Sequence, residues 1–376
     1  AAIWWLIGPE PRVFYTVSIF MTILIIACPC SVGLAIPVAL MVGLGRSATK
    51  GILIRDASCL SDINKLDYVL LDKTGTITEG KPKVIELVTH PEYTAQDCLL
   101  LMKALESNSE HPLAHAIINY QPELQPRLTV EDFKMVAGGG LSGQIEDKQY
   151  FVGSKNWLSS EVPHGTNSNL LVDNHFTQVF LADEDKVLAR VDITDAVKPD
   201  SAAAIKVLQA KGIKVAMVTG DNQDNADYIA RQVKLDSVYA NCKPQDKINI
   251  VKELQRQGHI VAFVGDGIND APSLTQANVG IAVGNGTDIA IQSANITLMR
   301  NSLIGVSDAI VIGKAINNNM RQNLFGSFVY NSIAVVVAAG ALYPVAQILL
   351  NPIIASAAMS LSSITVILNA MRLRKL

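Results

Sequence analysis

Two long stretches without a charged side chain constrain this chain more than any other feature of its sequence. Residues 13–45 and 322–371 contain no Asp, Glu, Lys or Arg. A membrane-spanning helix needs about 20 apolar residues, so the first stretch has room for one span and the second for two. Tyr343-Pro344 and Asn351-Pro352 mark the turn that would divide the second stretch.

Basic residues predict how these spans are oriented. Cytoplasmic segments next to membrane spans are enriched in Lys and Arg, so we expect the middle of the chain and its C-terminus to be cytoplasmic. The basic residues flanking the spans are Arg46, Lys50, Arg55, Lys314, Arg321, Arg372, Arg374 and Lys375.

The chain starts with Ala, and its apolar residues 3–6 resemble the end of an earlier span. This predicts a piece of a longer protein rather than a signal peptide.

Composition sets further bounds. A chain of 376 residues predicts two or three folding units. Its net charge of -3 gives no reason to expect a nucleic-acid partner. Cys59, Cys98 and Cys242 are scattered along the chain, so we expect reduced thiols instead of a disulfide framework.

The region between the membrane stretches contains three short apolar runs that end in polar residues. Residues 68–71 lead into Asp72, residues 215–218 into Thr219, and residues 260–264 into Gly265-Asp266. Segments at 224–233 and 246–257, between the second and third runs, predict helices. Buried strands that alternate with helices indicate a doubly wound α/β domain with a mostly parallel sheet. Such sheets place their chemistry at the carboxyl ends of the strands.

Residues 79–192 differ from this pattern, with helical segments at 95–106 and 113–120 followed by alternating segments at 144–152 and 177–191. We expect an α/β domain inserted into the sheet domain. The predicted organisation is 1–45 for the end of one membrane segment and a full span, 46–78 for a linker and the first part of the sheet domain, 79–192 for the insertion, 193–312 for the second part of the sheet domain, and 313–376 for two spans.

The strongest chemical motif is Asp72-Lys73-Thr74-Gly75-Thr76. A carboxylate at a strand end can attack a phosphoryl group, and the following loop offers backbone N–H groups to the phosphate. Thr219 can donate a hydrogen bond to the phosphate, and Lys247 can supply positive charge. Asp266 and Asp270 can hold Mg²⁺ together with Asp72, because Mg²⁺ prefers hard oxygen ligands.

These motifs resemble the haloacid-dehalogenase superfamily, in particular its P-type ATPase branch. Phosphatases of that superfamily carry a second aspartate two residues after the nucleophile, where this chain has Thr74. Without that base we expect the aspartyl phosphate to persist, as a pump requires. Thr74 also joins the Mg²⁺ ligands that the resemblance implies. The implied catalytic residues are Asp72, Lys73, Thr74, Thr219, Gly220, Asp221, Lys247 and Asn269.

The insertion resembles the nucleotide-binding domain of heavy-metal pumps. Ser109-Glu110-His111-Pro112-Leu113 and the glycine triplet 138–140 carry this resemblance. It implies that ATP binds at Glu106 and His111, with Gly138 and Gly140 letting the backbone approach the nucleotide.

Cys28-Pro29-Cys30 lies inside the first uncharged stretch. Proline removes a helical hydrogen bond, and the local unwinding lets two thiols converge. Soft thiolates select Cu⁺ or borderline Zn²⁺. The motif resembles the transport site of heavy-metal pumps.

The last two spans narrow the choice of metal. Tyr330 and Asn331 lie in one, and Met359 and Ser363 share a helix face in the other. A thioether suits Cu⁺, and zinc- and cadmium-exporting relatives carry ionisable residues in these spans, which are lacking here. The pattern resembles the copper-exporting branch.

The sequence therefore predicts an integral membrane ATPase, in a bacterial plasma membrane with cytoplasmic catalytic domains, that exports Cu⁺ through phosphorylation of Asp72. The expected partners are ATP, Mg²⁺, membrane lipid, a cytosolic copper chaperone, and the actuator and N-terminal regions of the same pump. Three alternatives stay open: a pump for Ag⁺ or for Zn²⁺ and Cd²⁺, a membrane-anchored ATP-binding fragment that transports nothing, and a membrane-tethered phosphatase.

Overall fold

The computed structural model describes residues 1–136, 139–162, 170–172, 176–266, 268–284 and 288–375. Its contacts divide the chain into two compact units. The first comprises residues 1–66, 294–300 and 305–376, and the second comprises residues 67–293 and 301–304.

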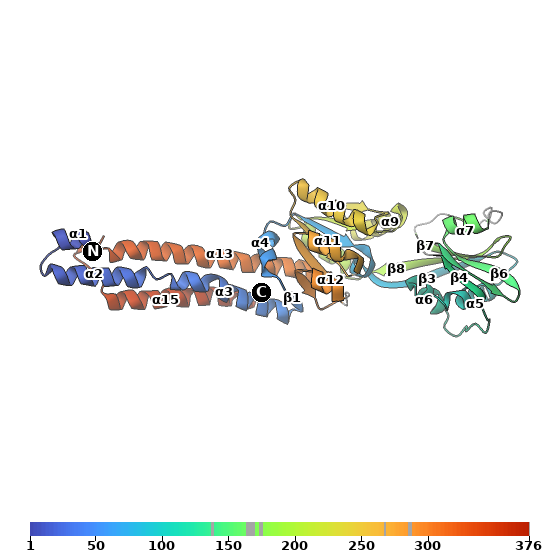
Figure 1. Ribbon diagram of the computed structural model, residues 1–376, viewed down its shortest axis with the longest axis horizontal. Helices are drawn as coiled ribbons and strands as arrows, with labels where there is room; N and C mark the ends of the chain where they lie inside the picture. Colours follow the sequence, from blue (N-terminus) through green and yellow to red (C-terminus); the bar gives the residue numbers. More distant parts are fainter. Residues whose placement is uncertain (137–138, 163–169, 173–175, 267, 285–287, 376) are drawn as a thin grey trace. The chain divides into compact units, whose positions relative to one another are not determined.

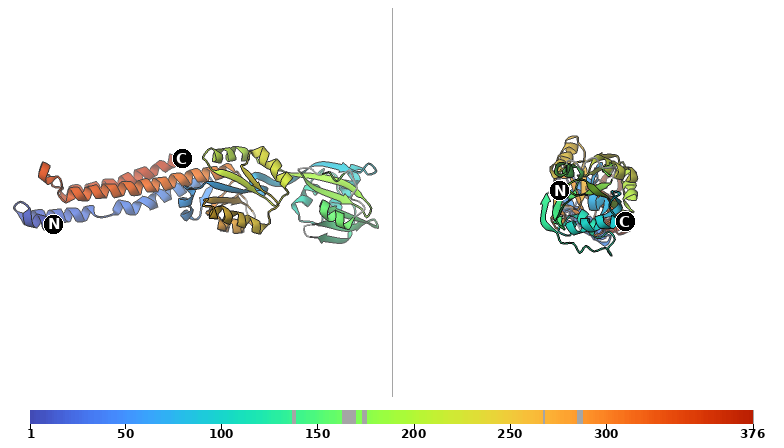
Figure 2. Two further views of the ribbon diagram at one scale, coloured as in Figure 1. Left: turned by 90° about the horizontal axis from the view of Figure 1, so that it is seen from above. Right: turned by 90° about the vertical axis from the view of Figure 1, so that its right-hand side faces the viewer.

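Long helices dominate the first unit and run side by side (Figures 1 and 2). Among the described residues, two segments are long and apolar enough to cross a membrane, residues 12–49 and 352–375. The third expected span forms the C-terminal half of one long helix, where polar residues such as Gln322 and Asn331 lower the hydropathy; it stays a prediction. The helices are α1 (Ala2–Ile7), α2 (Arg12–Ile26), α3 (Cys30–Thr49), α4 (Leu60–Ile63), α13 (Ile304–Ala338), α14 (Tyr343–Ala346) and α15 (Pro352–Met371).

The first apolar stretch is a broken helix, because α2 ends at Ile26 and α3 begins at Cys30. This confirms the unwinding expected around Pro29, which has no backbone N–H to continue the helix. Strands β1 (Ile52–Ile54) and β13 (Ile296–Leu298) of this unit pair in antiparallel fashion.

Buried asparagines join the helices of the first unit. The Asn323 amide donates to Asn319 Oδ1 at 3.2 Å and to the Ala35 carbonyl of α3 at 3.4 Å. Asn369 of α15 donates to Asn323 Oδ1 at 2.8 Å. These polar contacts link α3, α13 and α15. Large apolar side chains of α13, such as Phe325 and Phe328, instead point outward and are about 70 % exposed.

The second unit contains a parallel sheet, as the sequence predicts. Its strands lie in the order β12 (Val279–Val283), β11 (Val261–Gly265), β2 (Tyr68–Asp72), β9 (Lys214–Val218) and β10 (Ser237–Tyr239), and each neighbouring pair is parallel. Every residue of β2, β11 and β12 is buried, which explains their unbroken apolar runs. Helices cover both faces of the sheet in two groups (Figure 2): α8 packs beside α9 on one face, and α10, α11 and α12 pack beside one another on the other. These helices are α8 (Ser201–Gln209), α9 (Gln223–Val233), α10 (Pro244–Arg256), α11 (Ala271–Gln276) and α12 (Asp288–Ser293).

The insertion forms a six-stranded antiparallel sheet in the order β3-β8-β7-β6-β5-β4. Helix α5 (Ala95–Glu106) has the predicted bounds, and with α6 (Pro112–Ile118) it buries apolar side chains such as Leu99, Met102 and Ile117 against the sheet. Helix α7 (Lys155–Glu161) lies on the other face (Figure 1). The strands are β3 (Thr78–Thr89), β4 (Glu131–Val136), β5 (Gly140–Ile145), β6 (Lys148–Gly153), β7 (Thr177–Ala182) and β8 (Val187–Val197).

Candidate active site

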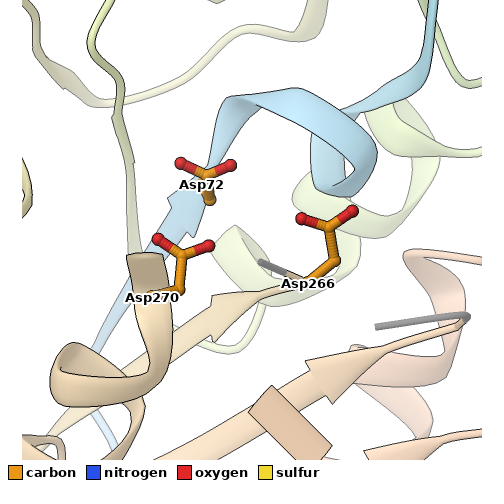
Figure 3. Close-up of side chains that lie close together, drawn as sticks. All are labelled: Asp72, Asp266 and Asp270. Carbon is orange, nitrogen blue, oxygen red and sulfur yellow. The ribbon is translucent and has the colours of Figure 1, made fainter. Parts of the chain in front are cut away.

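Three aspartates meet at the carboxyl edge of the parallel sheet (Figure 3). Asp72 is the last residue of β2, Asp266 directly follows β11, and Asp270 ends the short turn after it. Strands β2 and β11 are neighbours, so their ends lie together, and the carboxylate oxygens of the three residues lie within 4.8 Å of one another. The sequence prediction that these side chains converge is confirmed.

Lys247 is the counter-charge of this cluster. It projects from α10, and its Nζ lies 2.5 Å from Asp72 Oδ1 and 2.7 Å from Asp270 Oδ1. Burial by itself lowers the pKa of Lys247, but the charges of Asp72 and Asp270 outweigh it and raise this pKa, so the ammonium stays protonated. One lysine thus holds two of the three carboxylates.

The burial and the excess negative charge of this cluster change the pKa values of its carboxyl groups. Burial, together with the nearby charge of Asp270, raises the pKa of Asp72 to about 7, although Lys247 opposes the rise. Burial and Asp270 also raise the pKa of Asp266. Because a divalent cation would favour the ionised forms, and because carboxylate oxygens are the ligands that Mg²⁺ prefers, the residues present fit a magnesium ion.

The loop after Asp72 packs directly on this cluster. Gly75 has a φ of +71°, and a Cβ atom there would lie 1.8 Å from Asp266 Oδ2. Only glycine allows this approach. Thr74 is exposed on the same loop, two residues after Asp72.

The other predicted catalytic residues surround the loop. Lys73 Nζ lies 2.6 Å from Asp221 Oδ2, and Asp221 also accepts a hydrogen bond from Asn225 at 2.7 Å. The buried Thr219 hydroxyl accepts from the Asp221 backbone at 3.1 Å. These contacts support the grouping of Lys73, Thr219 and Asp221 at the strand ends. Gly220 and Asn269 are exposed.

Lys198 and Asn301 are residues of this site that the sequence does not reveal. Lys198 follows β8 on the return from the insertion, and its Nζ donates to the Gly75 carbonyl and to Asn301 Oδ1, each at 2.5 Å. Neither residue belongs to a recognisable motif. Their separation of more than 100 residues from their partners leaves no local pattern to find.

A cavity of about 490 Å³ lies in the insertion. Glu106, Ser109, His111 and Gly140 line it, so the predicted nucleotide residues that the structure describes surround one space. Burial raises the pKa of Glu106 to about 7, so its protonated carboxyl group can donate a hydrogen bond near neutral pH. Gly138 lies outside the described residues.

The glycines beside this cavity have a packing role in the structure, and their approach to a nucleotide stays a prediction. A Cβ on Gly140 would lie 2.4 Å from both the Trp157 ring and the Val152 carbonyl, and one on Gly139 would lie 2.7 Å from the ring. Packing of Trp157 against the backbone therefore requires glycine at these two positions, whether or not a nucleotide is bound.

The two cysteines of the broken membrane helix converge, as the unwinding predicts. The structure joins Cys28 and Cys30 in a disulfide with their Cα atoms 5.4 Å apart, whereas the sequence predicts free thiolates as ligands. The disulfide and a pair of metal-binding thiolates both require the two sulfur atoms to lie close together. Only the reduced pair can bind a soft cation, because the thiolate is the ligand.

The other predicted metal residues lie on α13 and α15. Met359 is buried and packs with Ile26 of α2 and Tyr330 of α13. The hydroxyl groups of Tyr330 and Ser363 donate to backbone carbonyls of α15, at 2.9 Å and 3.4 Å. The Asn331 carbonyl oxygen is buried without a hydrogen-bond partner, and so is the Ser31 hydroxyl next to Cys30. Polar and soft groups thus face the interior of this helix bundle.

Comparison with known proteins agrees with this geometry. Residues 66–278 match the family model of haloacid dehalogenase-like hydrolases. The chain is 43 % identical to the copper-transporting ATPase 2 of Rhizobium meliloti over 99 % of this chain and 46 % of that protein. It is 40 % identical to a silver exporting P-type ATPase of Salmonella typhimurium over 99 % of this chain and 45 % of that protein. The chain thus spans about half the length of the curated relatives that it matches.

A solved structure extends the match to the fold. A zinc-transporting PIB-type ATPase in its E2.Pi state is 31 % identical, covers 93 % of this chain and 56 % of its own, and superimposes with a TM-score of 0.72. The strand-end aspartates, the lysine between them and these similarities lead to one assignment. The chain belongs to the haloacid dehalogenase-like hydrolase family, and nearly all of it corresponds to part of a heavy-metal-transporting P-type ATPase.

Proposed function

We propose that the complete protein uses ATP to export Cu⁺ through a phosphorylated Asp72. The observation that carries this proposal is the buried contact of Lys247 with both Asp72 and Asp270 at the strand ends. This contact brings together the carboxylate that we propose as the nucleophile, a positive charge and a second carboxylate. Phosphoryl transfer depends on such positioning and charge neutralisation.

In this reaction an Asp72 carboxylate oxygen attacks the γ-phosphorus of ATP. The new bond joins Asp72 to the phosphoryl group, and the bond between that phosphorus and the ADP oxygen breaks. Lys247 and Thr219 bind oxygens of the transferred group, and the loop after Asp72 offers backbone N–H groups. Mg²⁺ held by Asp72, Asp266 and Asp270, with Thr74 beside them, would neutralise charge on the phosphates.

The adenosine part of ATP binds in the cavity of the insertion. A protonated Glu106 can donate a hydrogen bond to a ring nitrogen of adenine, and His111 lies at the rim of the same cavity. Ser109 and Gly140 complete the lining.

Three features support Cu⁺ or Ag⁺ as the transported ion. Cys28 and Cys30 meet at the break between α2 and α3, so reduction would expose two soft ligands at one point. Met359 offers a thioether in the adjoining apolar cluster, and Asn331 offers an unpaired carbonyl oxygen. Residues 322–371 carry no charged side chain that would favour Zn²⁺.

The surface of the helices supports a membrane setting. Exposed apolar side chains extend along α13 as well as α15, with Ile333 60 % and Ile353 76 % exposed. Lipid around three spans, cytoplasmic catalytic domains in a bacterial plasma membrane and a cytosolic copper chaperone as the metal donor complete the proposal.

The test is phosphorylation of the complete protein with γ-labelled ATP under reducing conditions, with Cu⁺, Ag⁺, Zn²⁺ or Cd²⁺. We expect an acid-stable phosphoenzyme in wild type and none in Asp72→Asn. Turnover should be stimulated by Cu⁺ and Ag⁺ and lost in Cys28→Ser/Cys30→Ser, whereas the control Cys242→Ser should keep it. Labelling of Asp72→Asn would refute the mechanism, and stimulation by Zn²⁺ would refute the choice of ion.

A further inference from the structure

Lys198 is a buried lysine whose role the phosphorylation chemistry described so far does not explain. Its side chain is 5 % exposed. Two of its hydrogen-bond acceptors are neutral oxygens, the Gly75 carbonyl and Asn301 Oδ1. A buried ammonium costs free energy unless it is well hydrogen-bonded, so its contacts set where it can lie.

The contact with Gly75 fixes the orientation of a peptide group in the loop after Asp72. A trans peptide group is planar and its carbonyl and N–H point in opposite directions. Because the Gly75 carbonyl points to Lys198, the Thr76 N–H must point away from Lys198. The same glycine packs against the Asp266 carboxylate, so the orientation of this peptide group and the position of a predicted Mg²⁺ ligand are linked.

The neighbours of Lys198 hold the lysine itself in place. Its backbone N–H donates to the Ile77 carbonyl at 3.0 Å, and the Ser201 hydroxyl donates to the same carbonyl at 2.7 Å. Asp200 accepts a hydrogen bond from the Ser302 hydroxyl at 2.5 Å, next to Asn301. Residues 198–201 thus connect the loop after Asp72 with residues 301–302.

We propose that Lys198 is a positioning residue for phosphorylation of Asp72, which holds the Gly75–Thr76 peptide group in the orientation that the phosphoryl group requires, and that Asn301 keeps Lys198 at that place. This rests on the proposed function, because it assumes that Asp72 is phosphorylated. Lys198 does not touch the phosphate; it acts through the loop.

The test compares the phosphorylation rate at saturating ATP with ATP affinity in the complete protein. Lys198→Met should lower the phosphorylation rate by about 10- to 100-fold, because misplacing a reacting group by about 1 Å has a cost of this size. The ATP affinity of this variant should stay within about twofold of wild type. Lys198→Arg keeps the charge and the donors and should retain more of the rate. The matched control is Lys211→Met, which removes an exposed lysine from the same unit.

Asn301→Ala provides a second variant that keeps Lys198 but removes one of its two hydrogen-bond acceptors named above. We expect its rate to lie between those of wild type and Lys198→Met. If Lys198→Met is phosphorylated as fast as Lys211→Met, the inference is wrong while the proposed function stands. If Lys198→Met does not bind ATP, the substitution has disturbed more than the position of the loop after Asp72. A wild-type phosphorylation rate in Asn301→Ala then overturns the inference. A wild-type protein without Asp72-dependent labelling overturns both proposals.

Discussion

Replacement of Gly75 by alanine tests whether close packing of the loop on Asp266 determines the reaction rate. The added Cβ would lie 1.8 Å from Asp266 Oδ2 and 2.7 Å from its Cγ. An ordinary contact needs at least 3.4 Å, so the carboxylate or the loop must move by on the order of 1.5 Å. A left-handed backbone also costs a residue with a Cβ about 1–2 kcal/mol.

The structure therefore predicts two separate effects of Gly75→Ala. The free energy of unfolding should fall by at least the conformational cost of about 1–2 kcal/mol. The phosphorylation rate should fall about 100-fold, because a displacement of about 1 Å at a reacting centre has costs of this size. Rapid-quench labelling with γ-labelled ATP measures the rate, and thermal unfolding measures the stability.

Gly212→Ala is the matched control for this experiment. Gly212 has a similar φ of +75°, but an added Cβ would have nothing within 4 Å. This variant should show the conformational cost in stability and an unchanged phosphorylation rate. If the two variants are phosphorylated equally fast, the packing of Gly75 on Asp266 does not position the reacting groups and our reasoning is refuted.

Three further predictions concern the cation, the buried glutamate and the glycine loop. Mg²⁺ at about 100 times its Kd should stabilise wild type by about 2.7 kcal/mol, and Asp270→Asn should abolish this stabilisation in calorimetry; an equal Mg²⁺ effect in both would place the ion elsewhere. Because the pKa of Glu106 is raised from 4.5 to about 7 on folding, its neutral form is favoured in the folded state, so wild type should lose on the order of 2–3 kcal/mol relative to Glu106→Gln as pH rises from 4.5 through 7. Parallel stability curves for the two proteins over this range would contradict that prediction. Gly140→Ala should push Trp157 aside and weaken ATP binding, seen as a change in tryptophan fluorescence and a higher Kd for ATP; unchanged values would mean that the cavity tolerates a Cβ there.

Much of the catalytic centre could be predicted from the sequence. Apolar runs that end in Asp72 and Gly265-Asp266 predict buried parallel strands, and the carboxyl ends of such strands meet at one edge of a sheet. That rule brings Asp72, Asp266 and Asp270 together before any coordinates are known. Pro29 likewise predicts a broken helix, because the loss of a backbone hydrogen bond is local to the proline.

The tertiary structure decided how distant segments close around that edge. Lys198 reaches Gly75 across 123 positions and Asn301 across 103, and no local periodicity encodes such contacts. The glycine triplet predicted a close approach of the nucleotide to the backbone, whereas only the packed structure identifies Trp157 as a side chain that packs on Gly139 and Gly140. The position of a strand end follows from the regular geometry of that strand. Hydrogen bonds and close packing between distant segments depend instead on the three-dimensional path of the whole chain, which the two contacting residues do not specify by themselves.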